Sequence, residues 1–419
     1  MISPEGPDAG VPRLVVRTTR IGPLANGLLD LLPEHDSLAW VRDGDGLVGW
    51  GRAAVASTSG PGRFSDAQDW WRDLTAAADV LDDVDCAGSG LVAFGSFAFA
   101  DDPGDSVLAV PEVVVGRRGD LVWLTTIGTD EQPAPGLRPG SPARRPENVV
   151  FTDGARGGAD WETVVAEAVR RITAGDLDKV VLARDLVADL DAPLDTRWPL
   201  QRLAATYPPC WTFQVDGLFG ATPEMLVRRE RGLVTSRVLA GTIRRTGDDA
   251  HDLALAASLA RSSKDLEEHE YAVRSVADVL ADHCTGMNVP ESPFVLHLPN
   301  VMHLASDVAG VIDDDTSALE LAGALHPSAA VGGTPTKTAV DLILEIEGMD
   351  RGRYAGPVGW IDADGDGEWG IALRSASVEG DGTRVRLYAG CGIVADSDPG
   401  AELAESQAKL VPVRDALTS

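Results

Sequence analysis

Short apolar runs separated by glycine and proline dominate the first 127 residues, and they constrain the fold more than any other feature. Leu91–Phe99 and Leu121–Ile127 are examples, with alternating or continuous apolar character. Such runs are typical of strands in an antiparallel sheet. The chain has no repeat of fixed period and no βαβ unit with a glycine fingerprint. We therefore expect a mixed, largely antiparallel α+β fold rather than a Rossmann type.

The later part of the chain alternates between helical and strand patterns. Apolar residues from Trp161 to Ile172 fall at helical spacing, and Gly175 stands where a helix would end. A strand should begin at Lys179. The other expected elements are helices over Lys264–His283 and Ala401–Leu417 and a strand pair formed by Gly356–Ile361 and Trp369–Ser377.

A change of composition separates these two parts. Five prolines lie between Gly128 and Pro146, a density that no helix or sheet ladder accommodates. We therefore divide the chain into an N-terminal part (1–127), a loop or linker (128–148) and a region that carries the candidate chemistry (149–419).

The formal net charge of -29 argues against nucleic acid or an anionic membrane as partner, because both carry the same sign. Any site for a small anion must therefore supply positive charge locally. The four cysteines form no CxxC pair, which favours reduced thiols over a zinc cage or disulfides. Without an apolar run of membrane length or signal-peptide features at the start, the sequence predicts a cytoplasmic protein.

Two pairs of carboxylates are the strongest local signal. Asp265 and Glu268 lie three residues apart on one predicted helix, and Glu402 and Glu405 do so on another, so each pair shares a helix face. Two such faces brought together would provide oxygen ligands for a hard divalent ion such as Mg²⁺. Solvated helix faces would carry the same pattern.

The segment from Asp362 to Trp369 resembles the first positions of a calcium-binding loop. The resemblance fails at the twelfth position, where Leu373 stands in place of the required bidentate glutamate. A tight turn between two strands explains the same aspartates and glycines. We therefore expect a turn.

Three further residues have two readings each from local sequence. Lys179 opens an apolar strand, where it is either an exposed edge residue or a buried amine able to act as a base. Glu224 follows a proline turn and is either solvated or held protonated among apolar neighbours. His303, in an apolar stretch, is either a hydrogen-bonded core residue or part of a site.

Taken together and in this order, several segments resemble the chorismate-utilising enzymes, a family that includes anthranilate, aminodeoxychorismate, isochorismate and salicylate synthases. The segments are KVVLAR, FGATPEML, LAGTIRR, KDLEEHE, VMHLASDVAG, LHPSAAVGGTP, YAGPVGWIDADGDGEWGIALRSA and YAGCGIVADSDPGAELAESQAK. The resemblance covers Lys179 to Lys409. It implies one domain over 1–419, with two antiparallel sheets flanked by helices and the active site between them, chorismate as the substrate and no obligatory protein partner.

The resemblance also implies roles for individual residues. Glu268, Glu402 and Glu405, with Asp265 nearby, match a magnesium cluster. Residues that match the binding of substrate carboxylates are Arg374, Lys409, Tyr354 and the Gly390 backbone, and those that match the pocket lining are Gly241, Thr242 and His303.

Lys179 and Ala330 separate branches of the family. Members that transfer an amine usually have glutamine where this chain has Lys179, and members that add water have lysine. In the implied mechanism Lys179 activates a water that attacks ring carbon C2, and Glu224 protonates the departing C4 hydroxyl. Ala330 stands where salicylate synthases tend to have threonine. These residues favour an isochorismate synthase, with a salicylate synthase and a non-catalytic acidic metal-binding protein as alternatives.

Overall fold

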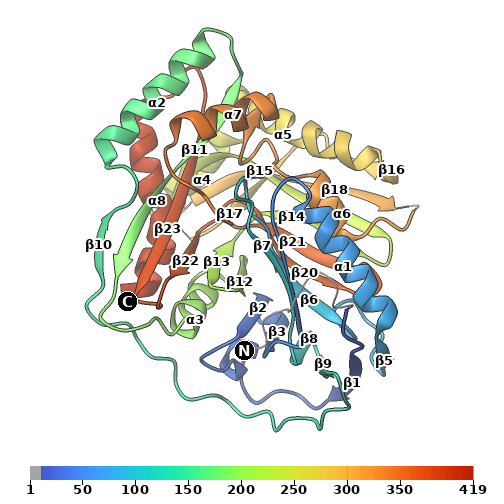
Figure 1. Cartoon of the computed structure of the whole chain (residues 1–419). Coiled ribbons are helices and arrows are strands. Elements are labelled where there is room, and N and C mark those ends of the chain that lie inside the picture. Colours follow the sequence, from blue (N-terminus) through green and yellow to red (C-terminus); the bar gives the residue numbers. More distant parts are fainter. Residues whose placement is uncertain (1–10, 300, 313, 419) are drawn as a thin grey trace.

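The computed structural model describes residues 11–299, 301–312 and 314–418, apart from the side chains of Lys264 and Glu268. Within them the strands form two large sheets, with helices on the outside (Figure 1). No helix among the described residues has the length and apolar character needed to span a membrane.

The first sheet has 13 strands, and all its pairings except β1 with β5 are antiparallel. In spatial order the strands are β10 (Val150–Asp153), β11 (Lys179–Asp189), β23 (Arg384–Ile393), β22 (Ser375–Glu379), β13 (Leu218–Thr222), β12 (Trp211–Val215), β2 (Ser37–Arg42), β3 (Asp45–Trp50), β8 (Val113–Arg118), β9 (Leu121–Gly128), β1 (Val15–Ile21) and β5 (Asp79–Asp82), with β19 (Gly333–Thr334) paired to the start of β11.

The second sheet has 10 strands and is antiparallel throughout. In spatial order they are β16 (Cys284–Asn288), β18 (Val301–Ile312), β15 (Leu233–Arg244), β14 (Met225–Glu230), β21 (Gly367–Ile371), β20 (Pro357–Asp362), β6 (Val92–Ser96), β7 (Ser106–Val110) and β4 (Ala54–Thr58), with β17 (Phe294–His297) paired to β18.

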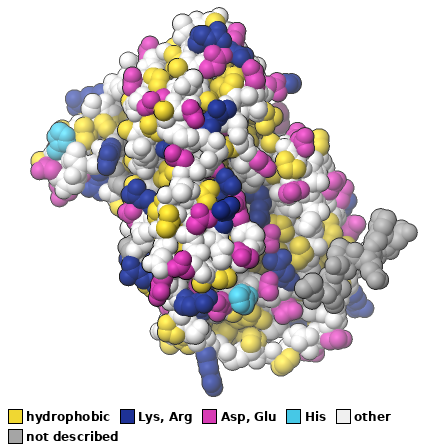
Figure 2. All heavy atoms as spheres, turned by 60° about the vertical axis from the view of Figure 1, so that its left-hand side comes forward, with side chains coloured by type: hydrophobic (Ala, Val, Ile, Leu, Met, Phe, Trp, Pro, Cys, Tyr) yellow, Lys and Arg dark blue, Asp and Glu magenta, His cyan; other side chains and the backbone are white. Residues whose placement is uncertain are grey.

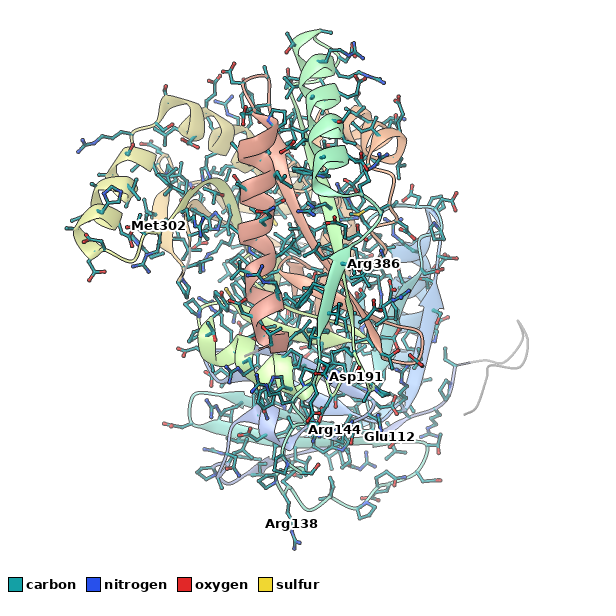
Figure 3. All side chains as sticks on the ribbon, turned by 90° about the vertical axis from the view of Figure 1, so that its left-hand side faces the viewer. Glu112, Arg138, Arg144, Asp191, Met302 and Arg386 are labelled. Carbon is teal, nitrogen blue, oxygen red and sulfur yellow. The ribbon has the colours of Figure 1, made fainter. Side chains whose placement is uncertain are left out.

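Helices cover the outer faces of these sheets (Figure 1). They are η1 (Leu28–Leu31), α1 (Arg63–Ala77), α2 (Gly158–Thr173), α3 (Arg197–Thr206), α4 (Asp249–Leu259), α5 (Ser263–Ala281), α6 (Ala318–Ala324), α7 (Thr336–Ile346) and α8 (Pro399–Thr418). Helix α5 packs on β15 and β18, and α8 packs on β23 beside α2 and α3, as the side-by-side ribbons of α2 and α8 in Figure 3 also show.

The predicted fold class is confirmed, and several predicted elements are found close to their expected bounds. Helix α2 ends at Thr173, and Gly175 follows it with a φ of 86°. Strand β11 begins at Lys179, and α5 and α8 cover the other two predicted helices. The aspartate segment is a turn, because Asp362 joins β20 to β21 and its carboxylate accepts the backbone N–H groups of Asp364 and Asp366.

Two expectations were too simple. Trp369–Ser377 is not one strand: β21 ends at Ile371 in the second sheet, and β22 begins at Ser375 in the first. The chain crosses between sheets at Arg374, whose φ of 49° breaks the extended conformation. The first 127 residues likewise do not form one sheet of their own, because β2 pairs with β12 in the first sheet and β6 pairs with β20 in the second.

The proline-rich segment between β9 and β10 has no helix or strand in the described structure and is largely exposed. In Figure 3 Arg138 projects from it away from the body of the protein. Its second half is attached more firmly, since the backbone N–H of Arg144 donates to Asp195 and the Ser141 carbonyl accepts from Arg197. The segment therefore runs along the surface between two parts that share both sheets.

Candidate active site

A cavity of about 300 Å³ lies between the two sheets and brings most of the predicted site residues together. The predicted residues that line it are Lys179, Glu224, Gly241, Thr242, Asp265, His303, Ala330, Tyr354, Arg374, Gly390, Glu402, Glu405 and Lys409. Glu268 is the one exception. Its backbone belongs to α5, and its side chain lies outside the described residues.

Glu224 and Arg374 enter this cavity from two neighbouring crossovers between the sheets. Glu224 stands between β13 and β14, and Arg374 between β21 and β22. The crossovers are tied together, because the Ile371 N–H donates to the Glu224 carbonyl at 3.1 Å and the Ala221 N–H donates to the Arg374 carbonyl at 3.2 Å. Local sequence could not reveal this, since it depends on strands changing sheets at matching positions.

The Glu224 side chain is buried, and this decides between its two readings. Burial raises its pKa to about 7, against the opposing effect of Lys179, Arg374 and Lys409. A carboxyl group that stays protonated close to neutral pH is able to donate a proton to a leaving oxygen. Glu224 therefore has the protonation behaviour of a general acid.

Lys179 is the first residue of β11, is half-buried and lines the cavity. The short strand β19 pairs with it through Thr334, so its backbone is held on that side as well. The electrostatic effect of Lys179 on Glu224 places the two ionisable groups at the same site. An amine and a protonated carboxyl in one cavity form a candidate base and acid pair.

Lys409 links α8 to the wall of the cavity formed by β23. Its Nζ donates to the Gly390 carbonyl at 2.9 Å and pairs with Glu405 at 2.7 Å. Burial disfavours the charged amine, but the paired Glu405 carboxylate favours it, and the pKa of Lys409 lies above its ordinary value. Lys409 therefore contributes a fixed positive charge.

Two carboxylates of α8 lie close together at the cavity. Glu402 and Glu405 lie one turn apart on α8, and Ser397 Oγ donates to Glu402 Oε1 at 2.8 Å. Their oxygens and the Cys391 sulfur lie within 4.8 Å of one another. Burial raises the pKa of Cys391 to about 12, so its sulfur is a neutral thiol beside the carboxylates. The two carboxylates offer oxygens suited to a hard cation. Asp265, from the first turn of α5, lines the same cavity but is not part of this close group.

A β-bulge shapes the opposite wall. The register between β15 and β18 shifts between Ala240 and Thr242, and Gly241 has a φ of 68° there. Beyond the bulge Thr242 Oγ1 lies 3.0 Å from His303 Nδ1. Burial, with Arg374 and Lys409 nearby, lowers the pKa of His303 to about 3, so the imidazole is neutral. Both readings of His303 therefore hold, because it is a buried, hydrogen-bonded histidine and its side chain lines the cavity.

Sequence reasoning missed several buried residues of the lining, among them the aromatic Tyr388 and the charged Arg351. Tyr388 stacks on Tyr354 with ring centroids 4.9 Å apart and planes 10° apart. It lies two residues before Gly390 on β23, so the alternation of a strand would have placed both on one face. Arg351 also lines the cavity, but nothing in its local sequence distinguishes it from a surface arginine.

The cavity resolves the charge problem posed by the sequence. The molecular surface is strongly acidic in sum, and on the face in Figure 2 acidic and basic side chains are intermingled. Three cationic side chains line the cavity. Lys179 comes from β11, Arg374 from the crossover between β21 and β22, and Lys409 from α8. Cations and carboxylates concentrated in this way suit an anionic ligand bound together with a metal ion.

Comparison with known proteins identifies the family of this chain. A family model described as chorismate binding enzyme matches residues 138–418. The isochorismate synthase MenF of Bacillus subtilis (strain 168) is 37% identical over 262 residues, which is 62% of this chain and 55% of that protein, so the match spans little more than half of that relative. The salicylate biosynthesis isochorismate synthase of Pseudomonas aeruginosa is 33% identical over 411 residues, 91% of this chain and 85% of its own.

Solved structures give the same result for the fold. The crystal structure of the putative 2,3-dihydroxybenzoate-specific isochorismate synthase DhbC from Bacillus anthracis aligns with a TM-score of 0.77 and 31% identity, covering 93% of this chain and 98% of that one. The chain belongs to the chorismate-binding enzyme family, in its isochorismate synthase branch.

Proposed function

We propose that the protein is a magnesium-dependent isochorismate synthase, which adds water at C2 of chorismate while the C4 hydroxyl leaves. The observation that carries this proposal is the pairing of Lys179 with the buried, protonated Glu224 in one cavity. The names of the relatives reported above support the choice of reaction.

The proton balance assigns a role to each residue. Lys179 accepts a proton from the water as its oxygen bonds to C2, and the ring double bonds shift. Glu224 gives its proton to the C4 oxygen, which leaves as water. Each transfer contributes roughly 10²-fold or more to the rate. Glutamine in place of Lys179 would be unable to accept the proton.

Binding of the dianionic substrate would use the cations and polar groups around the reacting ring. Arg374 and Lys409 would contact its carboxylates, with the Tyr354 hydroxyl and the Gly390 backbone beside them. Gly241, Thr242, His303 and Ala330 would form the wall against the ring.

The carboxylates of Glu402, Glu405 and Asp265 fit a magnesium ion, because all are hard oxygen donors and the nearby Cys391 is a neutral thiol. Glu268 would complete this set from α5. A magnesium ion held there would neutralise a substrate carboxylate.

The test is to incubate purified protein with chorismate, with and without Mg²⁺, and to identify products by chromatography. We expect isochorismate in reversible balance with chorismate, no turnover in excess chelator and recovery when Mg²⁺ is restored. Equal amounts of salicylate and pyruvate as main products would instead identify a salicylate synthase. No product under any metal condition would favour a non-catalytic metal-binding protein.

A further inference from the structure

Strand β11, which begins with Lys179, has a gap along one of its edges. On that edge β19 pairs with Lys179 and Val180, and β10 pairs only with residues 186–189. Residues 181–185 between them have no neighbouring strand on this side in the described structure. Buried backbone groups without partners cost free energy, so something else must satisfy them.

Backbone and side-chain groups fill this gap together. The Val181 N–H donates to the Gly332 carbonyl at 2.8 Å, and the Asp185 carbonyl accepts from the Gly154 N–H at 3.2 Å. An ion pair satisfies two further groups in the middle. The Ala183 N–H donates to Glu347 Oε2 at 2.7 Å, and Arg351 Nη2 donates to the Val181 carbonyl at 2.7 Å. The Ala183 carbonyl accepts from Trp161 Nε1 at 3.1 Å. Glu347, Arg351 and Trp161 thus satisfy the middle of this edge, where no strand pairs with β11.

The same pair reaches the loop that carries Ala330. Arg351 Nη1 donates to the Val331 carbonyl at 3.0 Å, while Nε and Nη2 form a two-pronged contact with Glu347 at 2.8 and 2.6 Å. Both side chains are almost fully buried, at 3% and 1% exposure. Because protein groups occupy its Nε, Nη1 and Nη2 atoms, Arg351 is not arranged as a substrate-binding cation, although it lines the cavity.

We propose that the Glu347–Arg351 pair is a positioning device that fixes the start of β11, and with it Lys179, against the Ala330 wall of the cavity. Val181 lies two residues from Lys179, and Val331 lies next to Ala330, so one guanidinium sets the spacing of base and wall. This rests on the proposed function, because it assigns Lys179 as the base. Displacing a reacting group by about 1 Å costs up to 10²-fold in rate, so such a device matters for turnover.

The test is Arg351→Lys, which keeps the charge beside Glu347 but loses the fork that reaches two carbonyls at once. The matched control is Arg197→Lys. Arg197 is equally buried, forms a two-pronged pair with Asp195 and donates to the Ser141 carbonyl, yet it does not line the cavity. Both variants should lower the unfolding temperature.

Only Arg351→Lys should lower kcat, by about 10-fold or more, with the KM for chorismate within about threefold of wild type. Glu347→Asp, which keeps the charge but shortens the reach to Ala183, should have the same effect. Wild-type kcat in folded Arg351→Lys, or equal losses in Arg197→Lys, would overturn the proposal. A large rise in KM at constant kcat would also overturn it, because Arg351 would then bind substrate directly.

Amide hydrogen exchange gives a readout that does not need turnover. Peptides covering residues 180–184 and 329–333 should exchange faster in Arg351→Lys than in wild type. Their exchange rates should be unchanged in Arg197→Lys. Unchanged exchange in both variants would contradict the positioning role even if the wild-type protein proved inactive. An inactive wild type would itself count against the proposed function alone.

Discussion

At the scale of single residues, burial assigns the chemistry that sequence left open. The protonation states of Glu224 and His303 were ambiguous from their sequence neighbours. Both are defined by burial between the two sheets. Burial favours the uncharged form of each, so the glutamate keeps a proton and the histidine lacks one. Neither effect is visible in the chain, because it depends on segments far away in sequence.

The first prediction concerns Lys179. Changing Lys179→Gln should reduce turnover by at least about 10²-fold, because the amide keeps the polarity of the site but accepts no proton. Unfolding temperature and chorismate binding should stay close to wild type. Lys337→Gln, at an exposed lysine on α7 outside the cavity, is the matched control and should be fully active. Turnover by Lys179→Gln near the control rate would remove Lys179 as the base.

The second prediction is a pH dependence set by Glu224. An acid must be protonated to act, so kcat/KM should fall as pH rises through the Glu224 pKa of about 7. A pH profile measured at saturating Mg²⁺ checks this. Burial also raises the pKa of Asp362 to about 7, but its carboxylate is tied to the Gly88 N–H and does not line the cavity. The decline should therefore persist in Asp362→Asn, and its disappearance there would assign it to Asp362.

At the scale of elements, helical spacing predicted the two helices that carry the paired carboxylates, but not that both helices border one cavity. The pairs on α5 and α8 are local features with a period of 3.6 residues. Asp265, Glu402 and Glu405 line one cavity because α5 packs on β15 and β18 while α8 packs on β23. Sequence likewise predicted β11 but not the gap beside it, since that gap depends on where β10 and β19 stop. Local elements are therefore predictable, and their contacts require the tertiary structure.

The third prediction tests the face of α8. Glu405→Gln should raise the Mg²⁺ concentration needed for half-maximal activity by about 10-fold or more, because removing one charged ligand weakens binding of a hard cation. Asp415→Asn on the same helix, outside the cavity, is the control and should leave the requirement unchanged. The measurement is a Mg²⁺ titration of initial rate. Identical titrations for both variants would mean that Glu405 belongs to a solvated face.

At the scale of the whole molecule, the two parts of the chain share both sheets despite the proline-rich segment between them. Sequence predicted that segment from its composition but gave no pairing for the strands before it. The structure places β2 beside β12 and β6 beside β20, so each sheet contains strands from both sides of the segment. Trp40 from the first part and Phe213 from the second pack against each other, with ring centroids 6.3 Å apart.

The last prediction follows from this shared core. A cleavage site for a specific protease, inserted between Ala134 and Pro135 in the exposed stretch, should be cut readily in the native protein. The two pieces should then elute together in gel filtration and retain chorismate turnover, because separation would expose both sheet edges and the buried aromatic residues at once. The uncut insertion protein is the control for the insertion itself.

Residues 149–419 expressed alone should lack cooperative unfolding, since β12 and β20 lose β2 and β6 as neighbours. Separate elution of the cut pieces, with a fully active C-terminal piece, would show instead that the first part is an independent domain.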